Sequence, residues 1–348
     1  MRRIVNAKTL VLLAAALIAA TTGLGCGRLG GEAGASPAST SGNDRVFMRV
    51  LGNEDLAEVD ARTGAVERRR LPVGCGDTPH CLIASGENLI VSGVGETVTL
   101  DASVPGRGRF TPVGNGWITV PSQEPGAVWL GILGRGRNSN RKLSAVREVD
   151  LEGNFIRSMK PPEGRWPMES TDQGLLFQYL DSVRLWSFDE RTLTEKLPGP
   201  FPADTDGSLV ASCDDPCREL AITDLASGTR RLFMPPGEFT WQAGYDGAFS
   251  PGGDRFVAPV GGRSRTRGLA LAMVDLEAGS VEIVPGSRGL ESWYRSADWS
   301  PSGQTLYWSN GKDVLFAYDA EDEETIRVTD LDLGKDGRVM QLVVVEGG

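Results

Sequence analysis

An apolar, alternating stretch that ends on an aspartate recurs seven times along the chain and limits the folds it can adopt. Gly usually follows shortly after the Asp. An Asp side chain accepts a hydrogen bond from the backbone two residues on, and Gly adopts the positive φ that closes a tight hairpin. The seven residues are Asp60, Asp101, Asp150, Asp189, Asp224, Asp275 and Asp319.

The spacing of these turns indicates the architecture. The clearest copy, residues 297–319, reads as a Ser-Pro-Ser-Gly turn, an apolar run, an Asn-Gly turn and a second alternating run. Pro and Gly turns between β-branched and aromatic runs are typical of short antiparallel strands. Neighbouring copies lie about 43 residues apart, the spacing of a four-stranded propeller blade. Seven copies predict seven blades.

The two ends of the repeat region predict how the ring closes. From Arg45 the first blade shows three strands, VFMRVLG, DLAEVD and AVERRRL, with no inner strand before them. After the seventh blade a further strand, Val339 to Val345, is left over. We therefore expect an all-β, seven-bladed β-propeller of four-stranded antiparallel blades, in which this C-terminal strand completes blade 1. Such closure removes open strand edges.

The N-terminus indicates export. Arg2, Arg3 and Lys8 precede a short apolar run, and Cys26 follows small residues. The run is shorter than the roughly 20 apolar residues of a membrane span and is typical of a secretory signal. The segment resembles the lipobox of bacterial lipoproteins, which implies that Cys26 is lipidated. The alternative is ordinary signal cleavage beside a chance cysteine.

The predicted domains follow from these features. We expect a lipoprotein signal peptide in residues 1–25, a lipid-anchored flexible linker in 26–44 and the propeller in 45–348. The linker is rich in Gly, Ala, Ser and Pro and has little apolar surface to bury. The predicted location is the cell membrane, on its extracytoplasmic side.

The other cysteines form two close pairs, Cys75 with Cys81 and Cys213 with Cys217. In an exported chain an even number of cysteines indicates disulfides, and local pairing is the simplest connectivity. Zinc is the alternative, but zinc takes four N or S ligands and His80 is the only histidine. We predict disulfides that hold two exposed turns, and no metal or other cofactor.

The later blades resemble a known repeat. The turns SPGGDRFVAPV and SPSGQTLYWS, followed by strands that end VDLEAG or YDAED, are similar to the WD40-like propeller repeats of TolB-type proteins of the bacterial envelope. This resemblance implies a fold and a habit of binding other macromolecules, and no particular activity.

The distinctive side chains are expected on one face. In a four-stranded blade, the loop between the second and third strands and the loop to the next blade open on the same side. Loops on a rigid scaffold often carry binding residues. For the arginines the alternative is two solvated loops, and for the aromatics it is caps over blade seams. The candidate binding residues are Arg135, Arg137, Arg141, Lys142, Trp166, Trp241, Tyr245, Arg263, Arg265, Arg267, Trp293 and Tyr294.

The net charge and the absence of catalytic motifs limit the functions that the sequence supports. A net charge of −10 argues against nucleic acid as a partner. No G-x-S-x-G motif is present, and a Ser-His-Asp triad would need the single histidine. We expect a binding or scaffold module for an envelope protein or an anionic envelope polymer, which meets the membrane only through its lipid. The alternative is a hydrolase or lyase that uses paired carboxylates at the mouth of the propeller channel.

Overall fold

In the residues that it describes, the computed structural model is built of strands joined by turns and loops and has no α-helix. It describes residues 43–347 except 52–54, 76–79, 94, 104–107, 135–141, 163–164, 180–181, 198–200, 214–216, 243–246, 263–267, 291–296 and 336. Within these ranges, no helical segment is long and apolar enough to span a bilayer. The predicted signal peptide, Cys26 and nearly all of the predicted linker lie outside the described residues.

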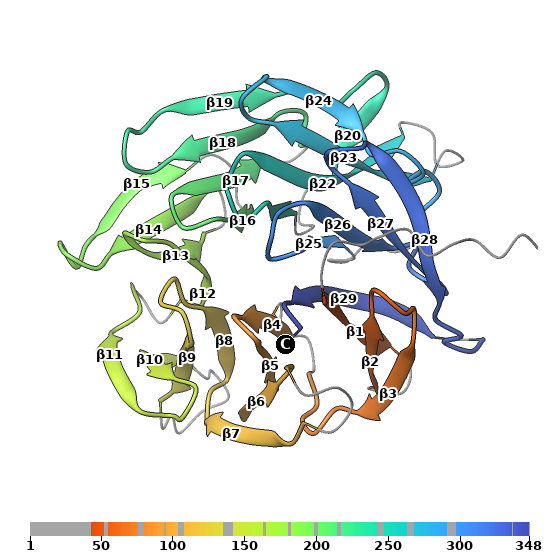
Figure 1. Ribbon diagram of the computed structural model, residues 1–348. Coiled ribbons are helices and arrows are strands. Elements are labelled where there is room, and N and C mark those ends of the chain that lie inside the picture. The colour runs from red at the N-terminus through yellow and green to blue at the C-terminus, as the bar shows by residue number, and fades with distance from the viewer. Residues whose placement is uncertain are drawn as a thin grey trace, which may run out of the picture. The chain divides into compact units, whose positions relative to one another are not determined.

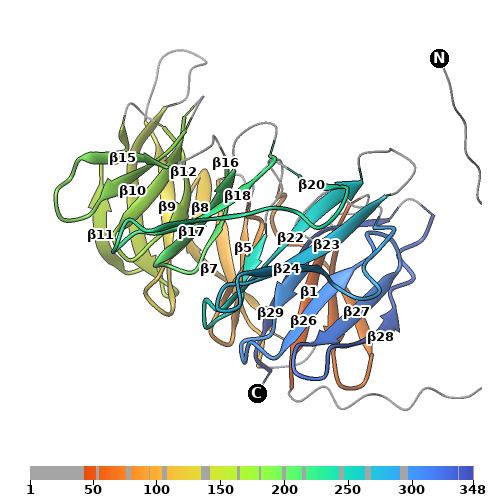
Figure 2. The same cartoon turned by 90° about the horizontal axis from the view of Figure 1, so that it is seen from above.

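Seven antiparallel sheets form the seven blades, each given from its inner to its outer strand (Figure 1). Blade 1 is β29 (Arg338–Val345), β1 (Arg45–Leu51), β2 (Asp55–Asp60) and β3 (Val66–Arg70). Blade 2 is β4 (Leu82–Ser85), β5 (Asn88–Ser92), β6 (Thr97–Asp101) and β7 (Phe110–Gly114). Blade 3 is β8 (Ile118–Pro121), β9 (Ala127–Leu133), β10 (Leu143–Asp150) and β11 (Phe155–Met159), which lie side by side in Figure 2.

The remaining blades follow the same order. Blade 4 is β12 (Pro167–Ser170), β13 (Gly174–Gln178), β14 (Val183–Ser187) and β15 (Leu193–Leu197). Blade 5 is β16 (Phe201–Thr205), β17 (Leu209–Cys213), β18 (Leu220–Asp224) and β19 (Arg230–Phe233). Blade 6 has an inner strand in two pieces, β20 (Phe239–Trp241) and β21 (Ala248–Phe249), then β22 (Arg255–Gly262), β23 (Leu269–Asp275) and β24 (Ser280–Ile283). Blade 7 is β25 (Ala297–Trp299), β26 (Thr305–Ser309), β27 (Val314–Asp319) and β28 (Glu324–Asp330).

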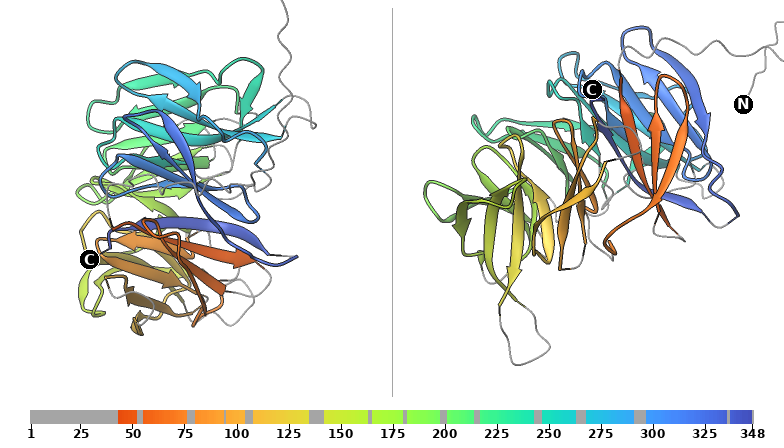
Figure 3. Two further views of the ribbon diagram at one scale, coloured as in Figure 1. Left: turned by 45° about the vertical axis from the view of Figure 1, so that its right-hand side comes forward. Right: turned by 60° about the horizontal axis from the view of Figure 1, so that its bottom comes forward.

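The predicted closure is confirmed. The C-terminal strand β29 pairs antiparallel with β1, from Arg45 opposite Val345 to Leu51 opposite Arg338. In the left view of Figure 3 this dark-blue strand lies beside the red and orange strands of blade 1. Strand β29 also contacts β4 of blade 2 and β25 of blade 7, so the inner strands form a closed ring.

Six of the seven predicted aspartate turns are confirmed, and one is corrected. Asp60 Oδ1, for example, accepts a hydrogen bond from Thr63 N at 2.9 Å. In blade 4 the residue opposite Gly174 at the end of the third strand is Ser187. Its Oγ accepts from Glu190 N at 3.2 Å, so Ser187 and not Asp189 makes the turn. A serine hydroxyl forms the same local bond as a carboxylate, more weakly.

The core lies between the blades. Each of the seven described clusters of buried apolar residues takes its members from two neighbouring blades. Because successive side chains of a strand point to opposite faces, each blade supplies two seams. On β1, Val46 and Met48 pack toward blade 7, whereas Phe47 packs toward blade 2.

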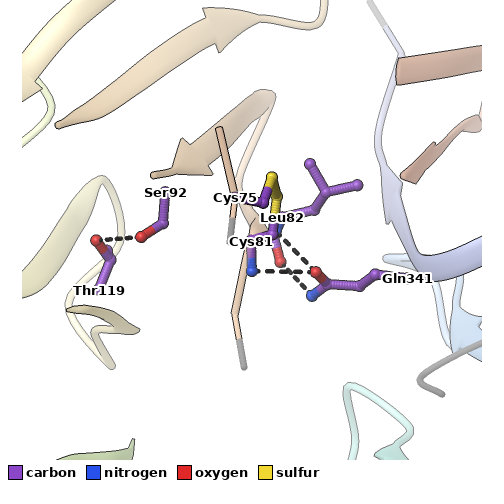
Figure 4. The surroundings of a disulfide bond; sticks show 6 residues. All are labelled: Cys75, Cys81, Leu82, Ser92, Thr119 and Gln341. Atoms are coloured by element: carbon purple, nitrogen blue, oxygen red, sulfur yellow. Dashed lines mark hydrogen bonds between the residues drawn. A yellow bond between two sulfur atoms is a disulfide. The ribbon is translucent and has the colours of Figure 1, made fainter. Parts of the chain in front are cut away.

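Polar side chains also join neighbouring blades. Gln341 on β29 bonds the backbone of Cys81 and Leu82, and Ser92 Oγ bonds Thr119 Oγ1 at 2.8 Å (Figure 4). A buried polar group that has its hydrogen-bond partners fixes their alignment, because any shift would leave a buried group unpaired at a cost in free energy. Further bonds across seams are Ser170 Oγ to Pro121 O, Phe249 N to Asp204 Oδ2, Trp299 Nε1 to Ala248 O and Val344 N to Asp298 Oδ2.

Both local disulfides are confirmed, with Cα atoms 5.4 Å apart for Cys75–Cys81 and 5.3 Å apart for Cys213–Cys217. The turn residues between the paired cysteines, 76–79 and 214–216, lie outside the described residues, whereas the cysteines themselves are buried. All four cysteines are at most 5% exposed and belong to core clusters between blades. Both cysteines of each bridge thus pack into a seam between blades.

Candidate functional site

The strand order gathers one set of connections on one face. Antiparallel order brings the loop between the second and third strands of a blade, and the loop to the next blade, to the same side. Strands β9 and β10 flank at this side the first basic segment, which contains Arg135, Arg137, Arg141 and Lys142. Strands β22 and β23 flank the second, which contains Arg263, Arg265 and Arg267. Both disulfides lie here too. We call this side the loop face.

Only part of the predicted binding set is described. Lys142 is exposed at the start of the third strand of blade 3. Trp166 is half-buried, contacts Trp117 edge-on at a centroid distance of 6.4 Å and packs on the cluster between blades 3 and 4. Trp166 therefore covers a seam. Outside the described residues lie Arg135, Arg137, Arg141, Tyr245, Arg263, Arg265, Arg267, Trp293 and Tyr294.

Trp241 is corrected from a loop residue to a core residue. It ends β20, is 3% exposed and belongs to the cluster between blades 5 and 6. Its Nε1 donates to Phe233 O at 3.0 Å, which satisfies the buried indole N–H. The interrupted inner strand of blade 6 explains the error, because Trp241 precedes the interruption and still pairs with Val260.

The seven inner strands surround a central cavity of about 220 Å³. Each of them contributes at least one lining residue. Three carboxylates line it, Glu169 on β12, Asp204 on β16 and Asp298 on β25. From the sequence alone, such convergence is only one possibility for an enzyme, and none of these three residues is predicted.

These three carboxylates occupy one layer of the ring. Their partners on the second strand are Leu176, Ala211 and Tyr307, each the third residue of its strand. In the other four blades the same register position holds an apolar residue, Val343, Ile83, Val120 or Ala248. An acidic residue inside a short inner strand, as in Ala297-Asp298-Trp299, is the sequence signal that could find this layer.

Each carboxylate contacts a donor. Asp298 Oδ2 accepts from Val344 N at 3.0 Å, and Asp204 Oδ2 accepts from Phe249 N at 2.9 Å. Both bonds cross a blade seam, and in both a backbone N–H pairs with a carboxylate that is buried (Asp204) or half-buried (Asp298). Glu169 Oε1 lies 3.1 Å from Nε2 of the buried His80. Across the described parts of the chain, no three His, Cys, Asp or Glu side chains are placed to hold a metal ion.

Comparisons with known proteins agree with the fold. No protein-family model matches the chain, and no curated protein is similar to it in sequence. The chain resembles the structure of a mutant puromycin hydrolase with a TM-score of 0.58 and 14% identity, over 82% of this chain and 52% of that one. It therefore spans about half of that hydrolase's length.

A second similar structure is a candidate 6-phosphogluconolactonase from Bacteroides fragilis. Its TM-score is 0.52 at 14% identity, over 89% of this chain and all of the other. Likeness at this level of identity concerns the fold and not the chemistry. The chain is a seven-bladed β-propeller of four-stranded antiparallel blades.

Proposed function

We propose that this protein is a lipid-anchored, extracytoplasmic β-propeller that acts as a binding or scaffold module for an envelope protein or an anionic envelope polymer. The observation that carries the proposal is the strand order, which brings the strands flanking both basic segments to the loop face. Seven arginine and lysine residues in those segments would attract an anionic partner to a protein of net charge −10.

The two disulfides support the location. Disulfides form and persist in oxidising compartments outside the cytoplasm. A lipid on Cys26 would hold the protein at the membrane, since each buried CH₂ contributes about 0.8 kcal/mol. We expect Cys26→Ser to move the protein from the membrane fraction to the soluble fraction, and an unchanged membrane fraction would contradict the anchor.

The enzyme alternative relies on the carboxylates of the central cavity. Paired carboxylates in a pocket are the minimum for a glycoside-cleaving enzyme. One oxygen of Asp204 and one of Asp298 already accept a backbone N–H from the neighbouring blade. We therefore infer that these two carboxylates hold neighbouring blades together, and we propose the loop face as the binding surface.

A pull-down from detergent-solubilised envelope tests the proposal. The loop-face variant changes Arg263, Arg265 and Arg267 to Ser. The matched control changes three exposed arginines on the opposite face to Ser, and so removes the same charge: Arg62, Arg109 and Arg230. We expect the wild type and the control to capture the same partner and the loop-face variant to lose it.

Two other results contradict the proposal. If all three proteins capture the same partner, the arginines of the loop face do not recognise it. If none of them captures a partner, the loop face does not act as a binding surface for an envelope component. Thermal unfolding of each variant, compared with the wild type, shows that any lost capture is not a loss of folding.

A further inference from the structure

Between β11, the outer strand of blade 3, and blade 4 lies a cavity of about 560 Å³ whose described charged lining residues are all cationic. We call it the rim cavity. No Asp or Glu is found among its described lining residues, although the protein as a whole is acidic. Its cationic and aromatic lining residues are Arg157, Lys160, Arg191, Trp129, Trp186 and Phe188.

Arg157 is held in one orientation from two sides. Its Nε lies 2.5 Å from Oε2 of Glu148, which is fully buried and whose Oε1 accepts from Ser122 Oγ. Its guanidinium carbon lies 4.1 Å from the centroid of the Phe188 ring. The side chain is still 43% exposed. The outer N–H groups of the guanidinium have no described protein partner, and they form the fork that binds an oxyanion through two bonds.

The rings give the cavity a flat apolar wall. Phe188 stacks on Trp129 with centroids 5.3 Å apart and an angle of 13° between the planes. Trp186 and Phe188 are half-buried, so part of each ring faces the cavity. Aromatic faces of this kind accept an aromatic ring or the C–H face of a sugar ring.

Arg191 lines the cavity from an unfavourable backbone conformation. Its φ is 53°, in the left-handed region that strains residues with a side chain. The same turn position in blades 1, 5 and 6 holds Gly64, Gly228 and Gly279. Blade 7 has Glu323, with φ 55°. Strain kept at one position is a reason to look for a function of the side chain there.

We propose that the rim cavity binds a small oxyanion, a carboxylate or a phosphate, that is attached to an aromatic or sugar ring. The Arg157 fork binds the oxyanion, Lys160 and Arg191 add positive charge, and Trp186 takes the ring. A cavity of this size is within the usual range for small ligands, roughly 300–1,000 Å³. The inference does not depend on the loop face, because none of the residues that carry it lies in the two basic segments.

Tryptophan fluorescence measures this binding directly, because Trp129 and Trp186 line the cavity. The aromatic probes are phenyl phosphate and benzoate, and the sugar probes are glucose 1-phosphate and glucuronate. Inorganic phosphate is the probe without a ring. We expect saturable binding of at least one ring-bearing anion, with a Kd at least about tenfold lower than that of inorganic phosphate. The pair of probes with the lower Kd shows whether the ring of the ligand is aromatic or a sugar.

Arg191→Gly separates a ligand role from a structural one. The substitution gives the turn the residue that blades 1, 5 and 6 use, so we expect a thermal midpoint no lower than that of the wild type. We also expect the Kd of the bound probe to rise about tenfold, because a charge-assisted contact is lost. Glu323→Gly makes the same backbone change in blade 7 and is expected to leave the Kd unchanged.

A second variant tests Lys160, the other cation that is proposed to attract the ligand. Lys160→Gln is expected to raise the Kd several-fold, whereas Arg147→Gln, on the neighbouring strand β10, is expected to leave it unchanged. Arg157→Gln is less suitable, because it leaves the buried carboxylate of Glu148 without its cation.

Three results would overturn the inference. The first is that no ring-bearing probe binds the wild type saturably. The second is that inorganic phosphate binds as tightly as every ring-bearing probe. The third is that neither Arg191→Gly nor Lys160→Gln changes the Kd. The variant that lacks Arg263, Arg265 and Arg267 should bind the probes like the wild type, so failure of the loop-face proposal remains distinguishable.

Discussion

Gln341 bonds Leu82 through both atoms of its side-chain amide. Its Oε1 accepts from Leu82 N at 2.9 Å, and its Nε2 donates to Leu82 O at 2.7 Å. The same Oε1 accepts from Cys81 N at 3.1 Å. Gln341 is 4% exposed, so one buried side chain from the C-terminal strand holds the inner strand of blade 2 (Figure 4).

Gln341→Leu should weaken the protein at this seam. The change leaves two N–H groups and one carbonyl without their buried partner, and each such loss costs about 1–3 kcal/mol. We expect the free energy of unfolding, measured by urea denaturation, to fall by at least about 3 kcal/mol. The control is Gln173→Leu at an exposed turn, expected within about 0.5 kcal/mol of the wild type. Equal effects of both changes would contradict the role of Gln341.

Removal of β29 should open the ring. A chain that ends at Gly337 lacks the inner strand of blade 1 and exposes the edge of β1. We expect this chain to lose its near-UV circular dichroism and to recover it when a peptide of residues 338–348 is added. Fluorescence anisotropy of the labelled peptide measures the binding, and a scrambled peptide is the control. Recovery with the scrambled peptide, or a native spectrum without any peptide, would contradict closure by β29.

The architecture could be predicted because its signals are local. Asp turns, their spacing and one unpaired strand at the C-terminus determine the number of blades and how the ring closes. The predictions from sequence are wrong where the local pattern shifts. In blade 4 the turn residue is Ser187 and the nearby Asp189 is not, and only the pairing of Ser187 with Gly174 distinguishes them. The sequence predicts a loop at Trp241 because the inner strand of blade 6 is interrupted after it.

The cavities were harder to predict, because they depend on contacts between blades. Asp298 lines the central cavity only because β25 meets β26 in a register that pairs it with Tyr307. Arg157 and Phe188 come from different blades, and nothing in either segment shows that the guanidinium will lie on the ring. Sequence patterns identify which strand face is buried, and the packing of blades decides which side chains meet.

The disulfides should make a measurable contribution despite their short loops. Their cysteines are 6 and 4 residues apart in sequence, and closing a loop of this size contributes about 2 kcal/mol by restricting the unfolded chain. We expect dithiothreitol to lower the free energy of unfolding of the wild type by about 4 kcal/mol. A variant with all four cysteines changed to Ala should not respond. An equal response of both proteins would show that the reductant does not act through these bridges.

Asp44 should make stability depend on pH in a specific direction. It is 8% exposed, and Tyr307 Oη donates to its Oδ2 at 3.0 Å. Burial raises the pKa of Asp44 above its ordinary value of 3.8, while the bond from Tyr307 lowers it. A carboxyl whose pKa is raised by folding favours the protonated form of the native state. Its stabilising contribution is therefore complete below about pH 4 and is lost as pH rises through the folded pKa.

Asp44→Asn tests this direction, because the Asn side chain keeps an oxygen for Tyr307 but carries no charge. We expect the variant to be more stable than the wild type at pH 7, and the difference in thermal midpoint to shrink as pH falls toward 4. All other titrating groups are present in both proteins, so their contributions cancel when the two thermal midpoints are subtracted. Tyr307→Phe removes the donor and leaves Asp44 buried, so we expect it to lose more stability at pH 7 than at pH 4. A constant difference between Asp44→Asn and the wild type across this range would show that the Asp44 carboxyl does not titrate differently in the folded and unfolded protein.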